Sequence, residues 1–174
     1  SLELKINAYG KNHSLVGLGF MNLGALEYTM NKLESSESNL LTALENFKTS
    51  LNANHIWFGL TNFWYSKILT EKSNYSEAEK CIRTSLAIYK NNYPKDHPNI
   101  ISANAELGII FLHQKKYAEA ENLLVTGYEQ IKQLKGEKDH NTIRLLEYLI
   151  KLYEKNKNTN KLSYYNQLLH QAKK

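Results

Sequence analysis

The sequence predicts an all-α fold built from a tandem repeat, and three observations lead to it. Four histidines recur at nearly equal steps of 42, 42 and 43 residues: His13, His55, His97 and His140. Other residues repeat in phase with them, as in Lys95-Asp96-His97 and Lys138-Asp139-His140. Apolar residues within the intervals follow the helical spacing of three, four and seven. A period in this range is typical of solenoids, whose units pack on their neighbours.

The third interval contains the clearest pair of predicted helices. One apolar band runs from about residue 98 to 114, a second from 117 to 131, and the polar turn 113–116 lies between them. We therefore expect two antiparallel helices with a tight connection. Pro98 suits the first turn of its helix, and Asp96 is the expected N-cap.

The same pair recurs along the chain and divides it into four predicted repeats, at 13–53, 55–95, 97–138 and 140–174. Ser1-Leu2 lies two periods before Ser85-Leu86, so residues 1–10 match the tail of a second helix whose partner would precede residue 1. The expected architecture is a right-handed superhelical solenoid of eight main helices plus this half-repeat helix. The helix at about 159–173 has one apolar stripe and a polar outer face, which is typical of the cap that ends an array.

The 43-residue step between His97 and His140 predicts a one-residue insertion in the turn Lys135-Gly136-Glu137. Small residues recur where the two helices of a pair are expected to cross. They are Gly24, Ala78, Gly108 and Ala120, and a small side chain there lets the backbones approach to about 8–10 Å.

These residues resemble the tetratricopeptide repeat. Leu107-Gly108 followed by Phe111, and Tyr117 followed by Ala120, fit its pattern. The 42-residue period, longer than the usual repeat of about 34 residues, is similar to the kinesin light chain type, as is Asp96-His97-Pro98 between repeats. The resemblance covers the whole chain; it is strongest in the third repeat, and Ser36 replaces the expected alanine in the first.

The composition and the motifs argue against several functions. The single cysteine, Cys81, excludes an internal disulfide framework and favours a reducing compartment. No apolar run approaches the length of about 20 residues that a membrane span needs. Equivalent histidines of stacked repeats lie roughly 10 Å apart, whereas ligands of one zinc lie within about 4 Å of each other. No phosphate loop or nucleophile elbow is present, so we expect no metal, no cofactor and no enzyme activity.

The resemblance implies a groove lined by the first helices, in which a peptide binds. Transferring the groove positions by the 42-residue register gives the candidate partner-binding residues Met21, Asn22, Phe63, Trp64, Lys67, Glu106, Ile109, Tyr148 and Lys151, with Arg144 one turn earlier. The family's usual asparagine is present only at Asn22. Three aromatics in a row, Phe63-Trp64-Tyr65, cannot all face one side of a helix; Tyr65 is expected in the core, and Phe63 and Trp64 fit groove or core equally.

The favoured function is therefore a protein-interaction module, the C-terminal part of a larger regulatory or signalling protein in the cytoplasm. Lys67, Arg144 and Lys151 favour an acidic peptide or helix as its ligand. An alternative is nucleic-acid binding through the basic C-terminal surface, with Lys155 and Lys161, which the modest net charge of +5 makes less favoured. A third is an architectural spacer or self-association surface, and residues 1–10 could pair with a second chain.

Overall fold

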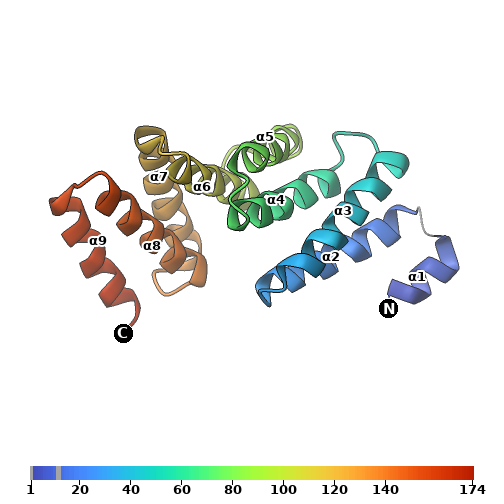
Figure 1. Cartoon of the computed structure of the whole chain (residues 1–174), viewed down its shortest axis with the longest axis horizontal. Coiled ribbons are helices and arrows are strands. Elements are labelled where there is room, and N and C mark those ends of the chain that lie inside the picture. The colour runs from blue at the N-terminus through green and yellow to red at the C-terminus, as the bar shows by residue number, and fades with distance from the viewer. Residues whose placement is uncertain (1, 11–12) are drawn as a thin grey trace. The chain divides into compact units, whose positions relative to one another are not determined.

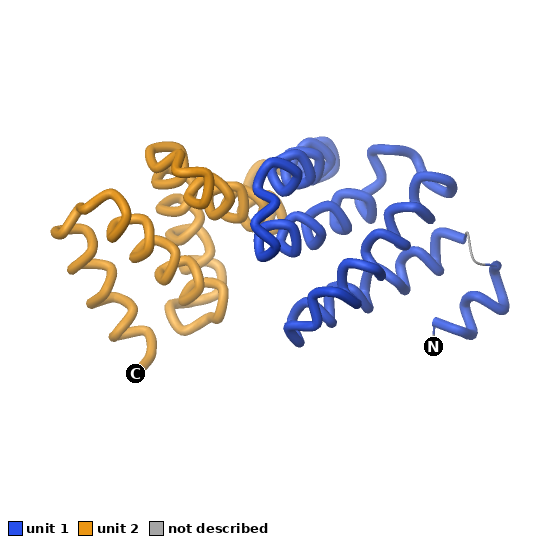
Figure 2. The backbone as a smooth tube through the Cα atoms, in the orientation of Figure 1, with its two compact units in different colours: residues 1–93 blue, residues 94–174 orange. Residues whose placement is uncertain are grey.

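The computed structural model describes residues 2–10 and 13–174, and these form nine helices and no strand (Figure 1). The all-α helical repeat fold predicted from the sequence is confirmed. Ser1, used above to align the first segment, lies outside the described residues. By its internal contacts the chain divides into two units, residues 1–93 and 94–174 (Figure 2).

Unit 1 contains one short helix followed by two helix pairs. Its helices are α1 (Leu2–Tyr9), α2 (Ser14–Thr29), α3 (Leu33–Ser50), α4 (Ile56–Glu71) and α5 (Tyr75–Asn92). The main contacts join α2 to α3 and α4 to α5, and α3 also packs on α4. One core cluster of this unit is formed by residues of α2, α3 and α4, namely Met21, Leu40, Ala43, Phe47 and Ile68.

Unit 2 contains two further helix pairs. Its helices are α6 (Pro98–His113), α7 (Tyr117–Lys135), α8 (His140–Lys155) and α9 (Thr159–Ala172). The predicted polar turn corresponds to residues 114–116, between α6 and α7. Apolar side chains of α6, α7 and α8 are buried, among them Ile109, Leu124 and Leu149.

The small residues lie at close helix crossings, as predicted. A Cβ atom added to Gly24 would lie 2.8 Å from Leu40 Cγ, and one added to Gly108 would lie 3.0 Å from Leu123 Cβ. Ala78 and Ala120 are fully buried. Ser36, which replaces alanine in the first repeat, is also buried, and its hydroxyl donates a 2.7 Å hydrogen bond to the carbonyl oxygen of Gly24. The larger side chain is therefore accommodated by a bond to the facing helix.

The expectation that Asp96 caps α6 is wrong, because His97 is the N-cap residue. Its imidazole Nδ1 accepts a hydrogen bond from the backbone N–H of Asn99 at 3.2 Å. The side chains of His13 and His55 cap α2 and α4 in the same way. Three of the four periodic histidines are therefore helix caps, each satisfying one backbone N–H that the helix leaves without a partner.

The predicted insertion in the turn at 135–137 is also wrong. The fourth cap is Asp139, whose carboxylate accepts a 2.9 Å hydrogen bond from the N–H of Asn141, while His140 is the first residue of α8. Because the caps are residues 13, 55, 97 and 139, the 42-residue period is unbroken. The extra residue in the histidine spacing reflects a change of capping residue and no change in the length of the chain.

Candidate functional site

The first helix of each pair carries the candidate binding residues. In unit 1 these helices are α2 and α4, which contact each other, and in unit 2 they are α6 and α8, which also do. The second helices α3, α5, α7 and α9 pack against them along the chain. The candidate residues therefore fall into two groups, one in each unit.

In unit 1, Lys67 lies at the centre of an aromatic cluster formed with Tyr28, Phe63 and Trp64. Its Nζ atom lies 4.9 Å from the ring centroid of Tyr28, 5.2 Å from that of Trp64 and 5.7 Å from that of Phe63. Lys67 is only 8 % exposed. At these distances the three rings attract the ammonium by cation–π interaction.

The aromatic run at 63–65 lies at the boundary between the core of unit 1 and the surface. All three side chains are half-buried. Trp64 and Tyr65 pack against the core cluster of unit 1. Trp64 also meets Tyr28 at a centroid distance of 5.8 Å and Phe63 at 5.5 Å, so part of each ring stays accessible beside the enclosed Lys67.

In unit 2, a buried ion pair joins the two first helices. Glu106 is 2 % exposed, and both Arg144 Nη1 and Nη2 lie 3.1 Å from its Oε2 atom. The carboxylate thus has a partner, without which a buried charge would be strongly destabilising. Arg144 also lies over the Tyr148 ring at 5.2 Å, and Lys151 lies over it at 4.7 Å.

A pocket of about 240 Å³ opens beside this ring, at the C-terminal ends of α6 and α8. It is lined by Leu112, His113, Lys115, Tyr117, Lys151, Glu154 and Lys155. Its three lysines, all exposed, outnumber its single carboxylate. The apolar walls and the basic rim can together hold a chain segment that carries both an apolar and an acidic side chain.

The structure brings some of the candidate residues together and separates others. Phe63, Trp64 and Lys67 share one cluster, whereas Asn22 is exposed on α2. Glu106, Arg144, Tyr148 and Lys151 share the other group. Ile109 is fully buried and Met21 lies in the core of unit 1. Neither of these two side chains offers a surface to a partner, so the proposed site does not include them.

Sequence reasoning missed Tyr28, whose ring lies next to the Lys67 ammonium. The equivalent position one repeat later is Thr70, so the repeat pattern did not predict an aromatic residue here.

Two lysines of the basic C-terminal surface are already paired with carboxylates. Lys161 pairs with Glu121, and Lys173 Nζ lies 2.8 Å from Glu147 Oε1.

In the described part of the chain no group of three His, Cys, Asp or Glu side chains could hold a metal ion. None of the described helices is long and apolar enough to cross a membrane.

The fold and the first-helix surfaces define an all-α helical repeat protein. Residues 60–133 match the family model of the tetratricopeptide repeat. The resemblance to the tetratricopeptide repeat predicted from the sequence is confirmed over these residues. No curated protein gives a significant sequence match to the chain.

Solved structures of kinesin light chain-like arrays share the fold. BtubC (BKLC) of P. vanneervenii is 14 % identical with a TM-score of 0.70, over 96 % of this chain and 65 % of that one. Two structures of a P. anserina protein described as a kinesin light chain with nearly identical TPR-like repeats have TM-scores of 0.68. They are 13 % and 12 % identical, over 99 % of this chain and 80 % and 82 % of theirs. The chain thus spans less than two thirds of the length of BtubC.

Proposed function

We propose that this chain binds an acidic peptide segment of a partner protein over the first helices of unit 2, α6 and α8. Tetratricopeptide repeats serve in general as protein-interaction modules and non-catalytic scaffolds. The observation that carries the finer proposal is the Tyr148 ring of unit 2, which is contacted by Arg144 and Lys151 beside the 240 Å³ pocket.

The charges around this ring favour an acidic ligand. Arg144 is already paired with Glu106. The exposed lysines that line the pocket are Lys115, Lys151 and Lys155. An aromatic ring with a basic rim is typical of interface anchors, because an aromatic side chain contributes area and a rim charge steers the partner. The half-buried rings of Phe63 and Trp64 would supply a comparable aromatic surface in unit 1. The single buried cysteine favours a reducing, cytoplasmic setting for this interaction.

The test uses labelled peptides as probes and charge reversal at Lys151. A fluorescein-labelled peptide of alternating glutamate and leucine is titrated by anisotropy against the wild-type chain, with a lysine–leucine peptide of equal length as its counterpart. We expect the acidic peptide to bind more tightly. Lys151→Glu should weaken its binding about tenfold, or 1.4 kcal/mol, because it replaces an attractive charge by a repulsive one.

Lys90→Glu is the matched control, since Lys90 is an exposed lysine near the end of a helix, α5, outside the pocket. Lys67 is unsuitable for charge reversal, because burying a carboxylate among three rings would destabilise the fold. Equal losses in Lys151→Glu and Lys90→Glu would reject the site. Preference for a single-stranded oligonucleotide, with affinity that falls steeply with salt, would favour nucleic-acid binding instead.

A further inference from the structure

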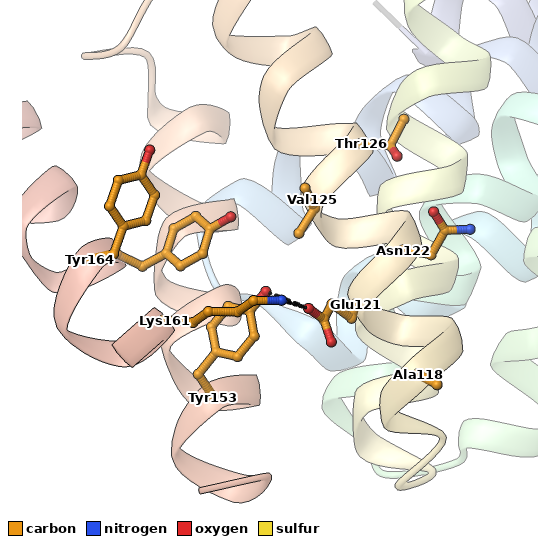
Figure 3. A pocket seen from close by; sticks show the side chains of 9 residues that line it. Ala118, Glu121, Asn122, Val125, Thr126, Tyr153, Lys161 and Tyr164 are labelled. Carbon is orange, nitrogen blue, oxygen red and sulfur yellow. Dashed lines mark hydrogen bonds and ion pairs between the residues drawn. The ribbon is translucent and has the colours of Figure 1, made fainter. Parts of the chain in front are cut away.

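A second pocket, of about 520 Å³, lies in unit 2 on the side of the second helices. Figure 3 shows Val125 and Thr126 on α7, Tyr164 on α9, and the pair of Glu121 and Lys161 between them. Tyr153 reaches the same place from α8. None of these residues lines the 240 Å³ pocket or belongs to the candidate binding residues, so this pocket is independent of the proposed function.

The polar end of the pocket leaves one carboxylate oxygen available. The Tyr153 hydroxyl donates a 3.0 Å hydrogen bond to Glu121 Oε1, and the Lys161 ammonium donates to the same oxygen. Among the described residues, no hydrogen bond to Glu121 Oε2 is found. The bond from Lys161 lowers the pKa of the Glu121 carboxyl, so the group is ionised at neutral pH. Glu121 Oε2 is therefore an acceptor for an incoming donor.

The wall opposite α7 consists of aromatic rings. Tyr165 stacks on Tyr153 at a centroid distance of 5.3 Å, and Tyr164 meets Tyr165 edge to face at 5.1 Å. Tyr164 is 54 % exposed, although its neighbour Tyr165 is buried. Because Tyr153 and Tyr165 are fixed by packing, the pocket presents a pre-formed aromatic wall with one accessible ring at its edge.

The charges of the residues that line the pocket favour a neutral ligand. The lining carries one carboxylate and one ammonium, Glu121 and Lys161, and is neutral as a whole. A cationic ligand would be repelled by Lys161 and by a chain of net charge +5. An anion would have to break the ion pair between Lys161 and Glu121 in order to bind the Lys161 ammonium. A neutral ring needs neither change: it can stack on the tyrosine wall and donate to the open carboxylate oxygen.

We propose that this pocket binds an aromatic side chain that carries a hydrogen-bond donor, the phenol of a tyrosine or the indole of a tryptophan, from a partner protein. The ring lies between the tyrosine wall and Val125, and its O–H or N–H donates to Glu121 Oε2. Lys161 stays in place and keeps the carboxylate oriented. A second contact point of this kind, on the second helices, would let the array hold a partner on more than its first-helix surface.

The probes that test this are N-acetyl-tyrosinamide and N-acetyl-phenylalaninamide, which differ by one hydroxyl group. Each is titrated into the full ¹⁵N-labelled chain while the amide resonances are followed by NMR. We expect saturable shifts at about millimolar affinity, located at residues 121–126 and 161–165, and severalfold weaker binding of the phenylalanine probe. Equal affinity for both probes would overturn the role of Glu121, and shifts elsewhere would overturn the site.

Two substitutions separate the parts of the pocket. Tyr164→Ala should reduce the affinity for both probes at least about fivefold by removing the accessible ring at the edge of the wall. Glu121→Gln should abolish the preference for the tyrosine probe, because the ionised acceptor is lost. Tyr9→Ala is the matched control, since Tyr9 on α1 is also 54 % exposed, and it should change neither affinity. Unchanged binding in Tyr164→Ala, or tighter binding of N-acetyl-argininamide by the wild type, would contradict the proposal.

Discussion

Single histidine nitrogens decide where three of the helices begin. His13, His55 and His97 each place Nδ1 3.2 Å from the backbone nitrogen two residues later. This is the position that a serine, asparagine or aspartate oxygen takes in a common N-cap. In the fourth repeat Asp139 takes the same role, which shows that the position requires an acceptor and accepts different side chains.

Replacing one of these caps should have a measurable cost. His97→Ala removes the acceptor for the N–H of Asn99, and we expect it to lower the free energy of unfolding by about 1 kcal/mol. His97→Asp should restore most of this stability, because the carboxylate supplies an acceptor as Asp139 does. Urea unfolding monitored by circular dichroism measures both variants. Equal destabilisation by the two substitutions would show that the imidazole acts by other contacts.

The environment of Cys81 predicts the reactivity of its thiol. Its thiol is buried in α5, and burial raises its pKa to about 11. The thiolate, which is the reactive form, is therefore scarce at neutral pH. Ellman's reagent at pH 8 should react with Cys81 far more slowly in the native chain than in 6 M guanidinium chloride. Similar rates in the two conditions would place the thiol at the surface.

The turns inside the helix pairs repeat as strictly as the helices do. Asn31, Ser73, Lys115 and Lys157 all have a positive φ, between 58° and 64°. In each turn the next backbone N–H donates to a carbonyl oxygen five residues earlier, at 2.8–3.0 Å. This is the Schellman motif, which usually has glycine at the left-handed position. Here other residues occupy it, so the sequence carried no glycine to mark these helix ends.

The left-handed turn predicts opposite effects of one substitution at two nearby lysines. Lys157→Gly should raise the free energy of unfolding by about 0.5–1 kcal/mol, because glycine adopts a positive φ without strain. Lys155→Gly, in the last turn of α8, should lower it by a similar amount through lost helix propensity. Thermal unfolding compares the two. The same sign in both variants would contradict the assigned turn.

The close crossing of α6 and α7 gives a second prediction for an element. Ala120→Glu places a charge and extra volume at a fully buried position, and overpacking alone costs about 1–3 kcal/mol. Ala118→Glu lies two residues earlier on the exposed face of the same helix and serves as the control. We expect a marked fall in melting temperature for Ala120→Glu and little change for Ala118→Glu. Equal melting temperatures would show that the register of α7 is wrong.

At the scale of the whole molecule, the helices of each unit pack on their neighbours in the chain. Within unit 1 the contacts join consecutive helices and the two first helices, α2 and α4, and unit 2 repeats this arrangement. The core cluster of unit 1 is formed entirely by residues of that unit. Stability in such arrays is approximately a sum of local terms.

Local stability predicts that damage to one unit stays within it. In Ala120→Glu, native-state hydrogen exchange should show lost protection in α6–α9, while buried amides of α3 and α4 keep most of theirs. The measurement compares exchange rates helix by helix with those of the wild type. Uniform loss of protection in both units would show one cooperative structure.

The periodicity was sufficient to predict the helices and their order, because a repeat of 42 residues fixes the phase of every apolar face. It was insufficient for the caps. The expected Asp96 cap and the expected insertion at 135–137 both came from taking the histidines as the marker, whereas the chain conserves the cap position and exchanges His for Asp. Among the predicted binding residues, Ile109 occupies a groove position of the repeat pattern but is fully buried. The repeat pattern shows which face of a helix a residue lies on, but it does not show how deeply a neighbouring helix covers that face.

The sequence by itself determined the repeat, the all-α class, the helix pairs and the small residues at their crossings, because each depends on local spacing along one chain. Only the tertiary structure decided which side chains meet across helices. Tyr28 over Lys67, Arg144 on Glu106, and Glu121 with Tyr153 and Lys161 join residues 32 to 40 positions apart. These contacts depend on the distance and angle at which packed helices cross, and the same packing forms the 240 Å³ and 520 Å³ pockets.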